Sequence, residues 1–271
     1  MVLNRSDRNL FVSLASAIAL AALVALMTFS AAKASEEEGF VTPFLPTANV
    51  MADVDKTLAT AKAKGKLALI VMGATWCHDS RGLVKRFRDD GISPTIDANY
   101  ETLYVDVGHL DQARAVNQRF GMPSIYATPT VMIVDPETGM LKNGKTMHLW
   151  RNADSISHDV TKEYFADEAL QARAPTAKVG AILASYYGAI NAFENAQAAR
   201  LVKGYDLIGP QLALGPGKYP DGFEALWGEV RGFRYKLTDD LLALRAKAEE
   251  MAAEGINEPL EFPSYPELSW E

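Results

Sequence analysis

Cys77 is the only cysteine of the 271-residue chain, and it lies among side chains capable of chemistry, in the run Trp76-Cys77-His78-Asp79-Ser80. It follows an apolar segment and a short turn, and it opens a stretch with helical spacing. A thiol at the start of a helix faces unpaired backbone N–H groups and the positive end of the helix dipole, which both favour the thiolate. We therefore expect Cys77 to be a partly exposed nucleophile. His78 would add positive charge, and the Ser80 hydroxyl would donate a hydrogen bond to the sulfur.

The segments around this motif predict a layered α/β domain with the element order α-β-α-β-α-β-β-α. Apolar runs predict strands at 67–72, 102–107 and 130–134. Helical spacing predicts helices at 50–64, 77–90, 111–120 and 155–172. Asn49 is suited to cap the start of the first helix, and Gly65 its end. A strong turn at 135–139 predicts that 146–150 returns as a strand, and 91–94 predicts a helix break.

These residues resemble the thioredoxin superfamily over about residues 49–172. Trp76-Cys77-x-x-Ser80 after an apolar strand is similar to the family's Trp-Cys-x-x-Cys motif, with the second cysteine replaced. The segment 127–130, Ala-Thr-Pro-Thr before an apolar strand, resembles the family's cis-proline segment. The resemblance implies a thioredoxin-like three-layer α/β/α domain.

The resemblance also implies roles for individual residues. Cys77 would be the attacking sulfur, and we place Ser80 and His78 beside it as catalytic candidates. The peptide bond before Pro129 would be cis, and Thr128 would present backbone groups to a bound peptide strand. The candidate substrate-binding positions are Trp76, Thr128 and Pro129.

Two departures from the family separate this chain from a dithiol reductase. Ser80 stands where the family has its resolving cysteine, so Cys77 alone could form a mixed disulfide but could not release it. Val71 stands where the family often buries an acid, six residues before the attacking cysteine. The first change means that an outside thiol must release the mixed disulfide, and both changes point away from a thioredoxin-type dithiol reductase.

The N-terminal segment 1–34 predicts a secretory signal peptide, with basic residues first, an apolar stretch of 20 residues at 10–29, and Ala-Lys-Ala at 32–34. An uncleaved membrane anchor is the alternative, since 20 apolar residues can span a bilayer. Cleavage would remove three basic and one acidic side chain and change the net charge from −7 to −9. We therefore predict an exported protein, in the bacterial periplasm, with no nucleic-acid partner.

The composition predicts five segments along the chain. They are a signal peptide at 1–34, an extended lead-in at 35–48, a thioredoxin-like domain at 49–174, a helical hairpin extension at 175–256, and an extended or disordered tail at 257–271. Within the extension, helices are expected at 178–202 and 223–253, with Gly209-Pro210 in the irregular connection. The aromatic residues of these helices are interpreted as packing groups.

Several functions remain open at this point. The first is a monothiol thiol-disulfide oxidoreductase whose Cys77 forms a mixed disulfide with a client protein or a small thiol. The second is a thioredoxin-fold binding module without turnover, and the third is peroxide sensing through a sulfenic acid at Cys77. No histidine lies at metal-ligand spacing, so we predict neither a metal nor another cofactor. A homodimer linked through Cys77 is also compatible with the sequence.

Overall fold

The structure is a computed structural model that describes residues 41–171 and 180–271, and residues 43–271 form one compact unit. The predicted signal peptide lies outside the described residues, and so does the predicted boundary at 174–175. No helix in the described part of the chain is both long enough and apolar enough to cross a membrane.

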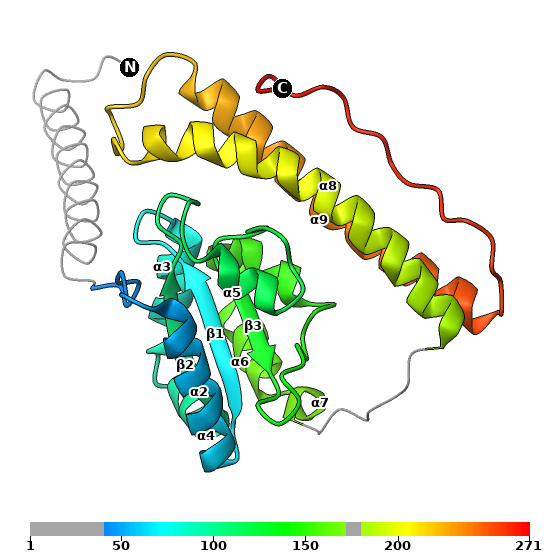
Figure 1. Ribbon diagram of the computed structural model, residues 1–271. Coiled ribbons are helices and arrows are strands. Elements are labelled where there is room, and N and C mark those ends of the chain that lie inside the picture. The colour runs from blue at the N-terminus through cyan, green and yellow to red at the C-terminus, as the bar shows by residue number, and fades with distance from the viewer. Residues whose placement is uncertain (1–40, 172–179) are drawn as a thin grey trace, which may run out of the picture. The chain divides into compact units, whose positions relative to one another are not determined.

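A three-stranded mixed sheet forms the centre of the domain, in the order β2-β1-β3 (Figure 1). The strands are β1 (Leu67–Gly73), β2 (Tyr100–Asp106) and β3 (Thr130–Val134). β1 runs parallel to β2 and antiparallel to β3, with Ile70 opposite Met132. All three strands were correctly predicted. The apolar runs of β1 and β3 are buried because both faces of the sheet are covered there, whereas most of β2 is only partly buried.

The first face of the sheet is covered by α2 (Val50–Lys64) and α5 (Arg114–Arg119). The ends of α2 were correctly predicted from the sequence. Its N-cap Asn49 accepts a hydrogen bond from the Ala52 N–H through Oδ1, and its C-cap Gly65 has a φ of 65°. Side chains of β1 and α2 pack into a common core on this face.

The second face is covered by helices and closed by an aromatic cluster. The elements on this side are α3 (His78–Phe87), α4 (Ser93–Asn99), the 3₁₀ segment η1 (Met147–Ser155) and α6 (His158–Ala166). The short α7 (Glu168–Gln171) follows α6 in the chain. Phe87, Trp150 and Phe165 meet with ring centroids 4.9–5.0 Å apart. This cluster ties α3, η1 and α6 together behind the sheet.

The strand predicted at 146–150 is wrong, because this segment is part of η1. The side chain of Asn143 takes over the hydrogen bonds that a returning strand would make with β3. Its Nδ2 donates to the Val131 carbonyl at 2.8 Å, and its Oδ1 accepts from the Ile133 N–H at 2.9 Å. The Lys142 N–H also donates to the Ile133 carbonyl at 2.8 Å, and Val134 and Leu141 form an isolated antiparallel bridge. These contacts and the buried amide together pair the edge of β3 without a full fourth strand.

The helix boundaries differ from the predictions at three places. The helix predicted to about residue 90 is broken, but α3 already ends at Phe87. A further helix that was not predicted, α4, begins at Ser93, with Pro94 in its first turn, where proline is tolerated. The helix predicted from 111 starts only at 114, since Ala113 has a φ of 57°. The helix predicted at 155–172 is divided into α6 and α7.

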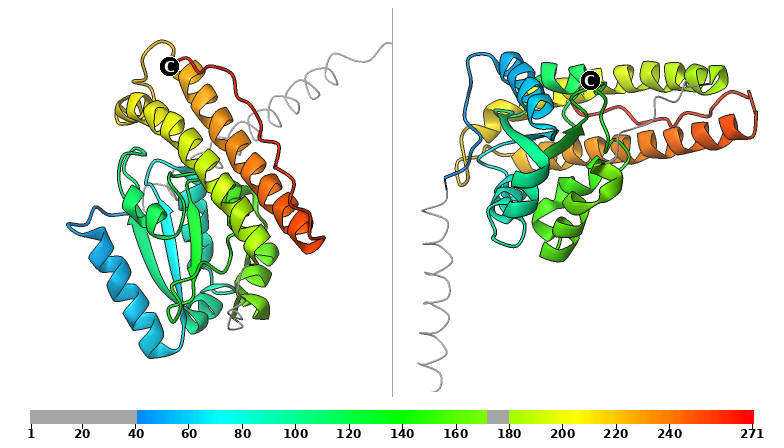
Figure 2. Two further views of the ribbon diagram at one scale, coloured as in Figure 1. Left: turned by 45° about the vertical axis from the view of Figure 1, so that its right-hand side comes forward. Right: turned by 90° about the horizontal axis from the view of Figure 1, so that it is seen from below.

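Two long antiparallel helices, α8 (Ala181–Leu212) and α9 (Phe223–Ala253), form the C-terminal hairpin and lie side by side in both views of Figure 2. The prediction that Gly209-Pro210 belongs to the connection is wrong, because both residues lie inside α8. Ile208 and Leu212 are buried on either side of them, so core packing holds the last turn helical despite the proline.

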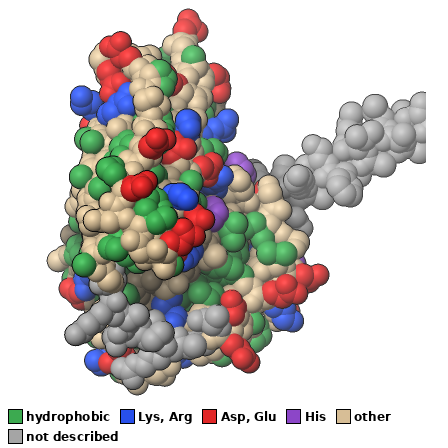
Figure 3. Space-filling view, turned by 90° about the vertical axis from the view of Figure 1, so that its right-hand side faces the viewer, with side chains coloured by type: hydrophobic (Ala, Val, Ile, Leu, Met, Phe, Trp, Pro, Cys, Tyr) green, Lys and Arg blue, Asp and Glu red, His purple; other side chains and the backbone are tan. Residues whose placement is uncertain are grey.

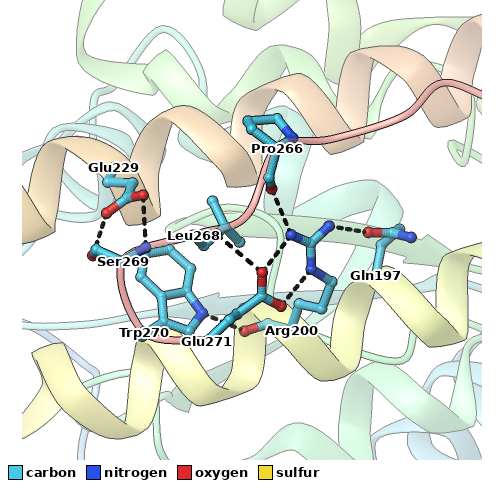
Figure 4. Close-up of polar contacts among 8 residues, drawn as sticks. All are labelled: Gln197, Arg200, Glu229, Pro266, Leu268, Ser269, Trp270 and Glu271. Atoms are coloured by element: carbon cyan, nitrogen blue, oxygen red, sulfur yellow. Dashed lines mark hydrogen bonds and ion pairs between the residues drawn. The ribbon is translucent and has the colours of Figure 1, made fainter.

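The tail at 257–271 is extended and lies along the hairpin, where Figure 4 shows its last residues. Arg200 of α8 donates to both carboxylate oxygens of Glu271 at 2.6 Å, and to the Pro266 carbonyl at 2.7 Å. The Trp270 indole N–H donates to the Arg200 carbonyl at 2.9 Å. The guanidinium holds the pKa of Glu271 down at about 2, so this clamp persists throughout the neutral range.

The hairpin shares its core with the α/β domain. One contiguous cluster of buried apolar residues runs from Ile70 and Met72 of β1, through Ile125 before β3, to Tyr205 of α8 and Val230 of α9. On the face of the molecule drawn in Figure 3, acidic and basic side chains are interspersed. The described fold is therefore a thioredoxin-like α/β domain whose core continues into a helical extension.

Candidate functional site

Cys77 occupies the N-cap of α3, just after the turn that follows β1, with φ −85° and ψ 120°. The sequence predicted this position but also predicted partial exposure, and that expectation is wrong: Cys77 is 6% exposed. Its sulfur donates a hydrogen bond to the Thr128 carbonyl at 3.0 Å. The structure therefore joins the two sequence motifs, 51 residues apart, in a single contact.

This hydrogen bond uses the proton of the Cys77 thiol, so it exists only in the protonated form. Cys77 makes no side-chain cap on the first turn of α3. The N–H groups of that turn would attract a thiolate once the proton has left. The Thr128 carbonyl therefore stabilises the resting thiol, and the N–H groups at the start of α3 would stabilise the thiolate.

Ser80 is completely buried, and its position differs from the one predicted. Its hydroxyl accepts a hydrogen bond from the Ala74 N–H at 3.4 Å, and the described structure shows no hydrogen bond from it to Cys77. A Cβ placed on Gly73 would lie 2.7 Å from the Ser80 oxygen and 2.6 Å from the Phe44 ring. Ser80 therefore packs α3 against the end of β1.

His78 is the exposed member of the motif, with 71% of its side chain accessible. Its Nε2 lies 3.2 Å from the carboxylate of Asp79. Asp79 is buried, and its other oxygen accepts from the Asp154 N–H at 2.9 Å. Asp79 therefore fastens α3 to η1, while His78 borders the solvent side of the site.

Trp76 is held in place from two directions. Its indole N–H donates to the Gly108 carbonyl at 2.8 Å, and its ring is stacked on His109 with centroids 6.5 Å apart. Trp227 of α9 meets the same ring edge-on at 6.3 Å. Sequence analysis missed Trp227 as a site residue, because its helical spacing was typical of an ordinary packing aromatic.

The segment before β3 is buried and ordered by its own hydrogen bonds. The Thr128–Pro129 peptide bond is cis, and both residues are buried. The Thr130 hydroxyl donates to the Ala127 carbonyl at 2.7 Å. The substrate-binding candidates Trp76, Thr128 and Pro129 thus lie around the Cys77 sulfur, but the two at the cis bond are covered.

The α8–α9 hairpin covers the segment before the cis bond. Tyr205 of α8 is fully buried, and its hydroxyl donates to the Ile125 carbonyl in the segment before the cis bond. Burial raises the pKa of this hydroxyl to about 12, so it remains a donor at all physiological pH values. At Gly209 the backbone approaches so closely that a Cβ would lie 2.8 Å from the His109 carbonyl oxygen.

Ion pairs fix the hairpin to the domain at three separate points. Each joins a residue of the α/β domain to one of α8 or α9, namely Arg114–Asp206 at 3.0 Å, Arg151–Asp239 at 2.7 Å and Lys145–Glu249 at 2.5 Å. Lys145 lowers the pKa of Glu249, so this pair is charged at neutral pH. In residues 41–171 and 180–271, no group of three or more His, Cys, Asp or Glu side chains is arranged to hold a metal ion.

The comparison with protein families agrees with this fold. Residues 49–136 match a family model described as thioredoxin-like. A solved structure of a disulphide isomerase from Xylella fastidiosa Temecula1 is 29% identical, with a TM-score of 0.43, and the match covers 47% of this chain and 97% of that one. No curated protein matched the sequence. The chain therefore contains a thioredoxin-like domain, followed by a C-terminal helical region.

Proposed function

We propose that this protein is an exported, single-cysteine thiol-disulfide oxidoreductase of the bacterial periplasm, which acts through mixed disulfides at Cys77. The observation that carries the proposal is the contact between the Cys77 sulfur and the carbonyl of Thr128, directly before the cis bond to Pro129. It lies inside the segment that matches thioredoxin-like proteins. The start of α3 supplies the backbone N–H groups that a thiolate needs.

The reaction is a thiol-disulfide exchange. The Cys77 thiol gives its proton to water, and the thiolate attacks one sulfur of a disulfide R–S–S–R′. A bond forms between the Cys77 sulfur and R–S, the R–S–S–R′ bond breaks, and R′–S⁻ leaves and takes up a proton. The exchange needs no external oxidant or reductant, because one disulfide is exchanged for another.

Release of the mixed disulfide requires a second thiol from outside the chain. Ser80 has no sulfur, is completely buried and is bound to the Ala74 N–H. Val71, also completely buried, provides no proton acceptor on β1. A free thiol R″–SH would attack as its thiolate, regenerate the Cys77 thiol and leave as R″–S–S–R.

The test uses the mature protein and 2-hydroxyethyl disulfide as the probe. We expect intact mass spectrometry to find one mercaptoethanol adduct on the folded wild type and none on Cys77→Ser. Added 2-mercaptoethanol should remove the adduct. If the folded protein forms no adduct while the urea-unfolded protein does, the oxidoreductase proposal is wrong.

The second candidate is a thioredoxin-fold binding module without turnover. The burial of Cys77 and Thr128, each 6% exposed, favours it. A binding module would bind its partner equally well after Cys77→Ser, whereas an oxidoreductase would lose its covalent adduct. Pull-down of the wild type and Cys77→Ser from periplasmic extract under non-reducing conditions separates the two.

Export rests on the residue pattern of 1–34. We expect the protein to be recovered from the periplasmic fraction with Ser35 as its first residue. Recovery of the full-length chain in the membrane fraction would instead indicate that the segment remains as an anchor.

A further inference from the structure

The backbone carbonyls that an extended peptide would need at this site are already bonded, one of them to the hairpin. A peptide strand binds by pairing its backbone with unpaired N–H and C=O groups of an open edge. Here the Ile125 carbonyl is bonded to the Tyr205 hydroxyl, and the Thr128 carbonyl to the Cys77 thiol. Tyr126 and Ala127 between them are only 9% and 6% exposed. A peptide therefore finds this segment covered and both of these carbonyls in use.

The cover is firmly seated. Trp227 meets the Trp76 ring next to the reactive cysteine, and the close approach of Gly209 to the His109 carbonyl leaves no space even for one methyl group. The three ion pairs hold both helices and are spread over the interface. A client protein that binds at residues 125–128 would have to displace the Tyr205 hydroxyl from the Ile125 carbonyl.

The remaining approach to the sulfur is from the side of the motif turn. Thr75 directly before the motif and His78 within it are exposed, whereas Cys77 itself is 6% exposed. The Thr75 carbonyl is held by the Arg81 guanidinium at 2.9 Å, which fixes this turn. Access to the sulfur is therefore restricted, and thiol exchange depends directly on such access.

We propose that the α8–α9 hairpin sets the substrate class of Cys77, and that its substrates are low-molecular-weight disulfides and thiols rather than extended peptide disulfides. This inference rests on the proposed oxidoreductase function. In the reaction, Cys77 attacks a small disulfide, a small thiolate leaves with a proton from solvent, and a second small thiol restores Cys77. The hairpin takes no part in bond formation. It acts by keeping extended peptides away from the sulfur.

The experiment compares two probes with the same reacting disulfide. One is N-acetylcysteine and the other an extended, otherwise cysteine-free peptide, each linked through its cysteine to 2-mercaptoethanol. Mass spectrometry follows the adduct in which Cys77 carries N-acetylcysteine or the peptide and 2-mercaptoethanol has left. The rate of its formation with the folded mature protein is divided by the rate with the urea-unfolded protein. The intrinsic reactivity of each probe cancels in this ratio, which therefore measures how accessible the Cys77 sulfur is in the folded protein.

Gly209→Ala is the variant that disturbs the cover, and Gly188→Ala in an open part of α8 is its matched control. The new methyl group at 209 must push α8 away from the His109 carbonyl. Overpacking of this kind should favour the displaced hairpin by about 5- to 150-fold. We expect the folded wild type to react well only with the N-acetylcysteine probe. Gly209→Ala should raise the peptide rate by a factor in this range, with a much smaller effect on the small probe.

Trp227→Ala provides a second route to the same result, because it removes the contact with Trp76 without adding strain. Equal wild-type ratios for the two probes would overturn the inference and leave the oxidoreductase proposal intact. A peptide rate that neither Gly209→Ala nor Trp227→Ala raises above that of Gly188→Ala would also overturn it. If Cys77 reacts with neither probe in any folded variant, the proposed function itself is wrong.

Discussion

The hydrogen bond from Tyr205 to the Ile125 carbonyl provides the most direct test of how the hairpin is joined to the domain. Tyr205→Phe removes the hydroxyl and keeps the ring, which is fully buried in the shared core. The Ile125 carbonyl then loses this donor. Arg234, which is 3% exposed, lies beside the Tyr205 hydroxyl. Its guanidinium loses a polar neighbour as well.

The magnitude follows from the burial of both partners. A buried acceptor left without its donor costs about 1–3 kcal/mol, whereas the ring packing is unchanged. Because 1.36 kcal/mol is a factor of ten, the detached hairpin should become about 5- to 150-fold more populated. We expect the free energy of unfolding to fall by about 1–3 kcal/mol, provided that the hairpin and the domain unfold together.

Two measurements follow this change. Urea denaturation gives the free energy of unfolding, and the rate of Cys77 alkylation by iodoacetamide in native buffer reports how often the site opens. In Tyr205→Phe the free energy of unfolding should fall and the rate of Cys77 alkylation should rise. Tyr219→Phe is the control, since it removes a tyrosine hydroxyl for which the described structure shows no hydrogen bond.

The reasoning is refuted if Tyr205→Phe matches Tyr219→Phe in both stability and alkylation rate. A loss of stability without faster alkylation would refute it in part: the bond would then matter for folding, but the hairpin would not control access to Cys77.

Three further predictions concern other contacts. Asn143→Ala removes both side-chain hydrogen bonds to the edge of β3, and urea denaturation should show a loss of about 2–5 kcal/mol. Asp89 raises the pKa of His158, so their pair stabilises the fold below about pH 6.5 and is lost as the pH rises through the raised pKa. His158→Gln should therefore lower the thermal midpoint near pH 5.5 and have little effect near pH 9. Gly204→Ala places a methyl group 2.9 Å from the Trp270 ring, and limited proteolysis should cut the tail faster.

Each of these has an outcome that contradicts it. Asn143→Ala with wild-type stability would mean that water replaces the amide at the β3 edge. An effect of His158→Gln that does not change with pH would show that the ring acts by packing. For Gly204→Ala the control is Gly188→Ala, which makes the same change where a Cβ has no neighbour within 4 Å; equal proteolysis rates would disprove the tail contact.

The sequence predicted the elements whose signal is local. The run 67–72 is apolar without interruption, and it forms the central strand because both faces of the sheet are covered. Asn49 and Gly65 act through their own backbone and nearest neighbours, so their capping roles could be predicted from residue type alone. Cys77 at the start of α3 belongs to the same group.

The features that sequence analysis missed depend on contacts between distant residues. Asn143 replaces a strand because its amide reaches two backbone groups of β3, and nothing in segment 146–150 itself indicates this. The Ile125 carbonyl before the cis bond is bonded to Tyr205 of a hairpin that lies much further along the chain, and the buried residues of that hairpin have ordinary helical spacing. Gly209 suggested a loop, whereas its role is to let α8 approach the His109 carbonyl.

The shared core also has a consequence for the order of events during synthesis. Residues 49–171 leave the ribosome before α8 and α9, so the face that includes Met72 and Ile125 has no cover until the end of the chain has emerged. During that interval an apolar surface and a free thiol are exposed together on an incomplete chain. The newly made protein therefore depends on its last third to remove an aggregation-prone surface, and truncation within α9 should leave that surface permanently open to chaperones and proteases.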